Sequence, residues 1–513
     1  MKNRKIKVLL IFALAVLAVL VTAVFIRREN AGKTGEETTG TNESTADNKV
    51  QLPSDVKTIT FAVPDICRIE EDNLNVLNDE LTKDGYGYRL EIYPIEYEEY
   101  SSLLYDECKS GNVDVAFLGL GASDGSNNIY RLIKSGLFCS LDEVLFSDVG
   151  GALYSAFPKN LWEAVKCDGH IYSVPSVMSN DSGIYAAFNL DYIDEENADS
   201  WDDTIQGIRD IVSNAGWNDK EEAAFWYLLS GYDFEDMIGC EIRHGLLFDY
   251  DTLAVYNPLE SEKFIGFFSC LEEMKKEGIL DNATDYLENT GLNRINVRKN
   301  IESGNYMVAL GSGEAPDVFL KDNVKIVRIE PYLSSRINAS IGISANTEDV
   351  NAVADFLGIF YGSEKYGNLL LYGREGEDYQ VIDGFAVNPE GKPLDDMFIT
   401  KLCLDLFINV CPVEGESFPE NRKEAYFAYY EDIKRSPYIG FEPDTENMGQ
   451  INSDLDMFLS DMSIAAGEGE TENEGGSMVF YDEYLSEAKK RLEADGVESY
   501  LEDVRKQWEE FQK

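Results

Sequence analysis

The chain has 513 residues, of which 44% are hydrophobic and 12% aromatic, so it can bury a large core in two lobes or in about three domains. Its 95 acidic residues outnumber 44 basic ones, which gives a net charge of −51. Nucleic acid and anionic lipid headgroups repel so acidic a surface, so we expect no nucleic-acid partner. The charge favours solubility in a crowded or salty exterior and does not identify a ligand.

The N-terminus has the pattern of a membrane anchor. Basic residues within 1–7 precede 19 uncharged, mostly apolar residues from Val8 to Ile26, enough to span a bilayer as a helix. A cleaved signal peptide usually has a shorter apolar segment followed by small residues, whereas Arg27 and Arg28 follow here. Because the basic excess orients this end to the cytoplasm, we predict an uncleaved anchor over residues 1–28 with the bulk of the chain on the extracellular face of the membrane. Secretion after signal cleavage is the alternative.

Residues 29–54 are polar and lack an apolar period, which predicts a disordered tether. Beyond the tether, the pattern alternates between strand and helix, in the order strand, helix, strand, helix, strand, over residues 57–63, 74–81, 88–95, 97–108 and 113–118. This order predicts an α/β fold with a parallel sheet and right-handed crossovers. Farther along, Ser200 and Asp203 form a variant capping box, which predicts that a helix begins just after Ser200.

Three short sequence motifs, called words below, follow one another between Gly111 and Val177. Their residues are Gly111 and Asp114, then Gly136, Leu141 and Asp142, then Trp162, Lys166, Asp168, Gly169, Tyr172 and Pro175. No single word is specific, but their order and spacing together are. This passage resembles the extracellular solute-binding proteins of bacterial ABC importers, in the maltose-binding-protein-like branch known as family 1.

The resemblance covers roughly residues 57–513. Residues 182–194 resemble the family's first crossing into a second lobe, and residues 338–379 resemble the return crossing. One oligosaccharide-binding subset carries a Y-G-x-E-G-x-x-Y word, which is matched here by Tyr372, Gly373, Glu375, Gly376 and Tyr379.

The resemblance implies a two-lobed periplasmic-binding-protein-like α/β fold of type II, with a ligand cleft between the lobes. The implied first lobe comprises residues 55–182 and 336–398, and the second comprises residues 183–335 and 399–513. Ligand binding would close the lobes by a hinge motion.

A glycine-rich loop raises the question of catalysis. Residues 121–125 match the G-x-S-x-G word of serine hydrolases, after a strand and before a helix, with Ser123 at the nucleophile position. The chain has only two histidines to serve as base, His170 and His244, and His170 lies at a variable position of the family word. We therefore interpret the segment as a loop at the carboxyl edge of the sheet, where Ser123 and Asp124 could bond a ligand.

The sequence gives little support for a metal or a cofactor, and we expect neither. None of the eight cysteines forms a C-x-x-C pair, and neither an H-E-x-x-H word nor an EF-hand loop is present. Most of the cysteines have apolar neighbours, so we expect free, buried thiols. One long-range disulfide is left open.

We expect ligand contacts from aromatic and polar residues at positions that fit the cleft. Aromatic rings stack on the C–H-rich faces of sugars, while carboxylates and arginines bond their hydroxyl groups. The candidates are Asp65, Ser123, Asp124, Tyr185, Trp226, Tyr227, Tyr372, Arg374 and Glu375. Tyr372 and Glu375 could equally be structural, because a Tyr-Gly corner often closes a helix.

The resemblance implies a monomeric, non-enzymatic protein that captures an oligosaccharide and presents it to ABC permease subunits. A peptide or another organic solute is the alternative ligand. A third interpretation is a receptor that passes its occupancy to a membrane sensor, which the anchor motivates. From a different class, an exported serine or glycoside hydrolase would act through Ser123 or through a pair of acids.

Overall fold

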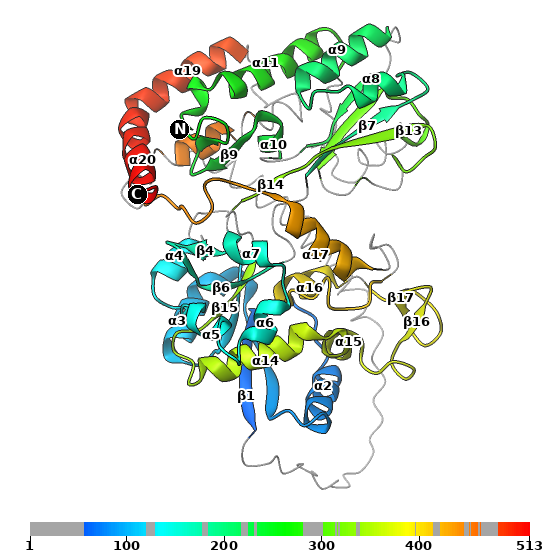
Figure 1. Ribbon diagram of the computed structural model, residues 1–513, viewed down its shortest axis with the longest axis vertical. Helices are drawn as coiled ribbons and strands as arrows, with labels where there is room; N and C mark the ends of the chain where they lie inside the picture. Colours follow the sequence, from blue (N-terminus) through cyan, green and yellow to red (C-terminus); the bar gives the residue numbers. More distant parts are fainter. Residues whose placement is uncertain are drawn as a thin grey trace, which may run out of the picture. The chain divides into compact units, whose positions relative to one another are not determined.

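The computed structural model describes residues 56–119, 129–176, 183–216, 224–229, 233–280, 301–312, 315, 319–334, 339–395, 397–413, 421–445, 451, 453–459, 462 and 481–513 (Figure 1). The predicted anchor over 1–28 and the predicted tether over 29–54 lie outside these residues. Within the part described, no helix is long and apolar enough to cross a lipid bilayer.

The first sheet has five strands in the order β2-β1-β3-β15-β6. The strands are β1 (Lys57–Pro64), β2 (Tyr88–Ile95), β3 (Val115–Leu118), β6 (Ser173–Pro175) and β15 (Ser340–Ile343). Both β2 and β3 pair parallel with β1, whereas β15 pairs antiparallel with β3 and with β6. The predicted parallel arrangement is confirmed for β1 to β3, and the return segment inserts between β3 and β6.

Four longer helices contribute buried residues to the first core, namely α2 (Glu71–Lys83), α3 (Tyr100–Ser110), α14 (Val350–Gly362) and α15 (Glu364–Tyr372). Leu77 and Leu81 recur at helical spacing on α2 and are fully buried. The helix α14 begins after Asp349, whose carboxylate accepts a hydrogen bond from the backbone N–H of Ala352 at 3.1 Å. This cap satisfies a backbone donor that the first turn of a helix leaves without a partner.

The second and third sequence words form one packed corner of the first core. They lie on short elements, α4 (Ile129–Lys134), α5 (Asp142–Leu145), α6 (Gly151–Ser155), α7 (Lys159–Ala164), β4 (Lys166–Cys167) and β5 (His170–Ile171). Asp142 accepts a hydrogen bond from the backbone N–H of Ile171 at 3.2 Å and lies 2.7 Å from Nδ1 of His170. Trp162 is buried, and its indole donates to the carbonyl of Tyr154 at 3.0 Å. These contacts explain the spacing of the words through packing.

The second sheet has four strands in the order β13-β7-β12-β8. The strands are β7 (Ile184–Asn189), β8 (Phe225–Tyr227), β12 (Val308–Ser312) and β13 (Val324–Ile329). The strand β7 is antiparallel to both of its neighbours, while β8 and β12 are parallel. Side chains of β7 point alternately to the two faces of the sheet. Ile184, Ala186 and Phe188 belong to the large second core, and Tyr185 and Ala187 belong to a small aromatic cluster.

The large second core combines helices with a three-stranded sheet. Its elements include α8 (Glu195–Asp199), α9 (Ile205–Ala215), α10 (Glu235–Ile238), α11 (Glu262–Lys276), α19 (Tyr481–Ala494) and α20 (Val497–Phe511), and the strands β9 (Cys240–Arg243), β10 (Leu246–Asp249) and β11 (Val255–Tyr256). The predicted start of α9 is wrong by one turn. Thr204 is the N-cap and accepts from the backbone N–H of Gly207 at 2.9 Å, whereas Ser200 ends α8.

The C-terminal part of the chain contributes to both cores. The helix α16 (Phe398–Leu404) packs on β1 and β3, and buried residues from Cys403 to Val413 belong to the first core. Tyr438 and the buried residues after it belong to the second core. The predicted boundary at residue 398 therefore falls inside a segment that packs with the first sheet. The hairpin of β16 (Gln380–Ile382) and β17 (Phe385–Val387) precedes α16 (Figure 1).

Candidate ligand-binding site

The strands of the first sheet define one edge of the candidate site. Because β1, β2, β3 and β6 run in the same direction, they all end at one edge of the sheet, where β15 begins. In α/β folds, ligands bind outside this carboxyl edge. In the second sheet, β8, β12 and β13 likewise end at the edge where β7 begins.

Three chain segments connect these two edges. The first runs from the end of β6 to the start of β7, and the second runs from β13 through β14 (Tyr332–Leu333) to β15. The third contains α17 (Arg422–Asp432) and β18 (Lys434–Arg435). The chain therefore passes from carboxyl edge to carboxyl edge, which concentrates loops and crossings where a ligand would bind.

The crossing segments lie side by side. The strand β14 pairs parallel with β18. Gly183 of the first crossing has a φ of +64°, and a Cβ on it would lie 3.0 Å from the carbonyl oxygen of Ile329 and 3.2 Å from Cδ of Pro331. A side chain at position 183 would thus separate the first crossing from the second. Such a compact bundle of crossings is the geometry that a hinge requires.

Half-buried aromatic residues line two of the crossings. Tyr332 of β14 stacks on Tyr250, with ring centroids 4.2 Å apart and planes inclined by 26°. Lys434 of β18 places its ammonium 5.6 Å from the centroid of the Tyr332 ring. On α17, Phe427 and Tyr429 are half-buried. Half-exposed rings beside polar groups are the usual components of sugar sites.

The third crossing contacts both sides of the molecule. Asn160 of α7 donates its side-chain amide to the carbonyl of Tyr430 at 2.6 Å, on the side of the first core. On the side of the second core, the hydroxyl of Ser436 donates to Oε2 of the buried Glu241 at 2.7 Å. Sequence reasoning missed these aromatics. The available signal was the run of four aromatics with one alanine over residues 426–430.

Asp65 lies where it was predicted, directly after β1 at the carboxyl edge of the first sheet. Its side chain is exposed, and its Oδ1 accepts a hydrogen bond from the backbone N–H of Tyr97 at 3.0 Å. Its own backbone N–H donates to the carbonyl of Ile95 at 2.8 Å. The loops after β1 and β2 are therefore tied together, and the carboxylate is held at the surface of the edge.

Tyr185 and Trp226 share one face of the second sheet, but both are buried. Tyr185 lies 5.7 Å from Phe319 between ring centroids, and burial raises the pKa of its hydroxyl to about 12. Trp226 is 5% exposed, and its indole N–H has no hydrogen-bond partner among the described residues. Both side chains therefore pack in the interior and do not present ring faces at the surface.

Tyr227 and Tyr372 belong to cores. Tyr227 points to the opposite face of the second sheet and packs against Phe267, and burial raises its pKa. The hydroxyl of Tyr372 donates to the carbonyl of Cys411 at 2.9 Å. Of the two uses that the sequence left open for Tyr372, the contacts favour the structural one.

Arg374 and Glu375 are exposed on a tight turn after α15. The turn is closed because Asp378 accepts from the backbone N–H of Arg374 at 2.8 Å, and Gly376 donates to the carbonyl of Tyr379 at 2.6 Å. Tyr372 and Tyr379 face each other with centroids 5.5 Å apart. The Y-G-x-E-G-x-x-Y word thus encodes a turn that holds two polar side chains in solvent.

Ser123 and Asp124 lie outside the described residues, so their predicted role stays a prediction. His170 is paired with Asp142, and His244 lies 2.6 Å from a carboxylate oxygen of Glu442. Among the described residues, no group of histidine, cysteine and acidic side chains could hold a metal ion.

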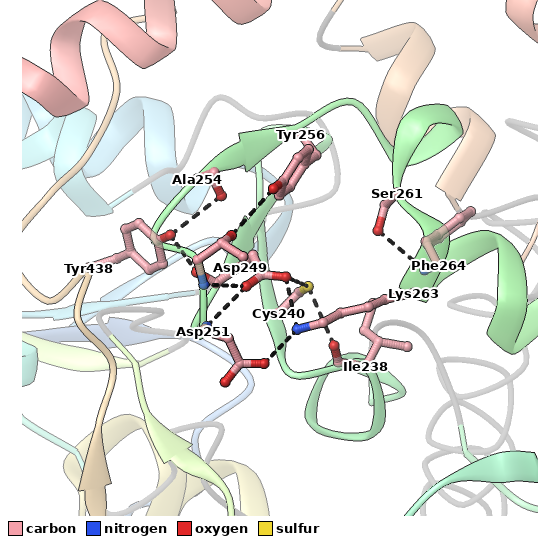
Figure 2. Close-up of polar contacts among 11 residues, drawn as sticks. Ile238, Cys240, Asp249, Asp251, Ala254, Tyr256, Ser261, Lys263, Phe264 and Tyr438 are labelled. Carbon is pink, nitrogen blue, oxygen red and sulfur yellow. Dashed lines mark hydrogen bonds and ion pairs between the residues drawn. The ribbon is translucent and has the colours of Figure 1, made fainter.

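A cluster of charged residues around Asp249 stabilises the turn that follows β10 (Figure 2). The ammonium of Lys263 lies 2.8 Å from Oδ2 of Asp249 and 2.9 Å from Asp251. The other carboxylate oxygen of Asp249 accepts from the backbone N–H groups of Asp251 and Thr252. Burial alone would raise the pKa of Asp249, but the bonds from Lys263 and Thr252 outweigh it and lower the pKa. Tyr438 donates to the carbonyl of Asp249 at 2.7 Å, which ties the C-terminal part of the chain to this turn.

The chain is related in sequence to a transport protein. It is 22% identical over 475 residues to a carbohydrate ABC transporter substrate-binding protein of Streptococcus pneumoniae, and the alignment covers 86% of this chain and 89% of that relative. No protein-family model matches the sequence.

Solved structures share the fold. The N-glycan transport solute binding protein (NgtS) from Streptococcus pneumoniae is similar with a TM-score of 0.62 and 19% identity, over 88% of this chain and 98% of that one. An HMO-binding, ABC-transporter-associated solute-binding protein from Bifidobacterium longum infantis is similar with a TM-score of 0.52 and 13% identity, over 88% and 98% of the two chains. The chain therefore has the two-lobed α/β fold of solute-binding proteins, and the predicted resemblance is confirmed.

Proposed function

We propose that this relative of carbohydrate substrate-binding proteins captures an oligosaccharide outside the cell and presents it to the permease of an ABC importer. The observation that carries the proposal is the bundle of crossing segments that joins the carboxyl edges of the two sheets, with half-buried aromatic rings on it. Such an arrangement lets two lobes close on a ligand while the connecting segments absorb the rotation. The carbohydrate relative and the sugar-binding structures of the same fold support sugar as the ligand class.

Binding uses two kinds of contact. The half-buried rings of Tyr332 and Phe427 offer their exposed apolar parts to the C–H groups of a sugar, and the carboxylate of Asp65 accepts hydrogen bonds from sugar hydroxyls. Arg374 and Glu375 supply further polar contacts, and we expect the same of Ser123 and Asp124. A carboxylate that is already oriented by the backbone of Tyr97 loses little conformational freedom on binding.

The reaction cycle contains binding, closure, transfer and reopening, and no covalent bond is broken. The chain works as a monomer, and the predicted anchor over residues 1–28 holds it on the extracellular face of the membrane. The closed, ligand-bound form is the one that the permease recognises. Closure requires that the ligand contact both lobes, because a ligand shifts a conformational equilibrium only by its difference in affinity for the two states.

Thermal unfolding of the purified chain with a panel of glycans and peptides tests the proposal. The panel includes Man1GlcNAc and Man5GlcNAc, which are bound in structures of the similar N-glycan transport protein. A ligand at 100 times its dissociation constant stabilises the folded state by about 2.7 kcal/mol. We expect one glycan class to raise the melting temperature and to be recovered unchanged.

Other outcomes identify other functions. Stabilisation by peptides alone would replace the sugar with a peptide ligand. Cleaved glycan in the recovered sample, lost on Ser123→Ala, would establish a hydrolase. Stabilisation by a sugar without any interaction with permease subunits would favour a receptor that reports occupancy to a sensor.

A further inference from the structure

The loop after β1 is fastened to α16 at the carboxyl edge of the first sheet. The backbone N–H of Arg68 donates to Oγ1 of Thr400 at 2.9 Å, and this hydroxyl lies 3.4 Å from the carbonyl oxygen of Arg68. Cys67 precedes Arg68 in the loop, and Cys403 lies three residues after Thr400 on α16. Residues three apart on a helix share one face, so Cys403 lies on the face that carries the contact with the loop.

The two thiols meet beside that contact. Cys403 is fully buried in the first core, and the half-buried Cys67 packs against the same core. The neighbouring side chain of Cys67, together with burial, raises the pKa of the Cys403 thiol. Burial raises the pKa of the Tyr100 hydroxyl, and the two nearby cysteines raise it further. Both cysteines are free thiols in this structure.

We propose that Cys67 and Cys403 are an oxidation site, at which a disulfide forms once the chain is outside the cell and links the loop after β1 to α16. This step rests on the extracellular location in the proposed function, because extracellular compartments favour disulfides and the cytosol does not. The cross-link would hold the loop that contains Asp65 at the carboxyl edge.

The oxidant is a small-molecule or protein disulfide. The thiolate of Cys67, which is the more accessible of the two, attacks one sulfur of the oxidant and releases the first thiol. The thiolate of Cys403 then attacks the Cys67 sulfur of the mixed disulfide and releases the second thiol. The protein loses two protons and two electrons, which the oxidant's disulfide takes up as two thiols.

Oxidation of the purified full-length chain tests the site. The folded protein is incubated with oxidised glutathione, unreacted thiols are alkylated, and peptides are mapped by mass spectrometry without reduction. We expect one linked peptide pair, Cys67 with Cys403, lighter than the two free peptides by two hydrogen atoms. We expect the oxidised chain to melt roughly 5 °C above the reduced chain, because the link closes a long loop in the unfolded state.

Variants separate the link from a general effect of cysteine loss. Cys67→Ser and Cys403→Ser should each abolish the linked pair and the rise in melting temperature on oxidation. Cys139→Ser is the matched control, because Cys139 is also a half-buried free thiol, and it donates to the carbonyl of Ile343 at 3.4 Å. This control should keep both effects.

Free Cys67 and Cys403 in the folded chain after oxidation, or a link of either to Cys108, would overturn the inference. The outcome is independent of sugar binding. A chain that binds a glycan but forms no link refutes the oxidation site alone, whereas a chain that forms the link and binds no glycan leaves the site standing and refutes the proposed ligand.

Discussion

Tyr332 of the crossing strand β14 stacks on Tyr250 of the second lobe with ring centroids 4.2 Å apart. Tyr250 follows Asp249, so the stack joins a crossing segment to the turn that Lys263 stabilises. The ammonium of Lys434 also lies near this ring, 5.6 Å from its centroid. This pairing places an aromatic ring in a fixed orientation on the segment around which we expect the lobes to close.

We predict that Tyr332→Ala weakens oligosaccharide binding about fivefold, because an aromatic contact contributes on the order of 1 kcal/mol beyond the area it buries. Isothermal titration with the glycan that stabilises the chain measures the effect. Tyr105→Ala is the matched control, since Tyr105 also carries a lysine ammonium over its ring, from Lys109 at 5.5 Å, but lies on α3. Equal losses in the two variants would remove Tyr332 from the site.

We predict that Gly311→Ala destabilises the chain by about 1–3 kcal/mol. Tyr185 folds over Gly311 on the neighbouring strand, so a Cβ at position 311 would lie 2.4 Å from the Tyr185 hydroxyl oxygen and 2.6 Å from its Cζ. The ring would have to leave its place against Phe319. Urea unfolding monitored by circular dichroism gives the free energy of unfolding.

Gly266→Ala is the control for this substitution. A Cβ at position 266 meets nothing within 4 Å, and the residue lies within α11. Alanine in a helix interior is favoured over glycine by about 0.5–1 kcal/mol, so this variant should be slightly more stable than the parent. A Gly311→Ala variant as stable as the parent would contradict the close approach of Tyr185.

We predict that Lys263→Met destabilises the chain by about 2 kcal/mol, because Asp249 would keep its charge without its cationic partner. The partial exposure of the lysine makes the loss smaller than for a fully buried pair. Lys392→Met removes a pair whose two side chains are each 71% exposed and should change the free energy of unfolding by less than about 0.5 kcal/mol. Similar small effects in both variants would show that the Asp249 cluster contributes little.

We predict a pH-dependent contribution from His244. Burial alone would lower its pKa, but the carboxylate of Glu442, with a smaller effect from Asp456, outweighs burial and raises it. A raised pKa in the folded state means that the stabilisation is fully present below the unfolded value near 6.5 and is lost as pH rises through the folded value.

The comparison of His244→Gln with the parent chain measures this contribution. The difference in free energy of unfolding should be largest near pH 6 and should shrink toward pH 9. His170→Gln serves as control, because His170 is largely exposed and its pair with Asp142 lies near solvent. A difference that grows with pH would contradict the raised pKa of His244.

Periodicity in the sequence was sufficient to predict the first three strands of the first sheet and the two helices between them. Strand alternation and helical spacing between residues 57 and 118 correspond to β1, α2, β2, α3 and β3, because local side-chain patterns repeat with the period of the element that buries them. The N-cap of α9 was predicted at Ser200 and lies at Thr204; both residue types can cap a helix, so the sequence alone does not choose between them.

Candidate ligand residues were harder to predict than elements. Tyr185, Trp226, Tyr227 and Tyr372 have the residue type of a sugar site, yet all four are buried. Adjacent residues on a strand point to opposite faces, so Trp226 and Tyr227 were certain to differ in environment, but the sequence does not say which face a loop covers. The position of Asp65 directly after a buried strand was predictable, and its role in ligand binding stays a prediction.

By itself, the sequence determined the α/β class, the order of the strands in the first half and the resemblance to solute-binding proteins, because all three depend on residues near one another in the chain. The tertiary structure decided which segments meet across long separations. The contact of Arg68 with Thr400, the pairing of β14 with β18 and the stack of Tyr332 on Tyr250 each join parts of the chain that local patterns describe separately. Contacts of this kind form only when the whole core is packed, so no local period in the sequence records them.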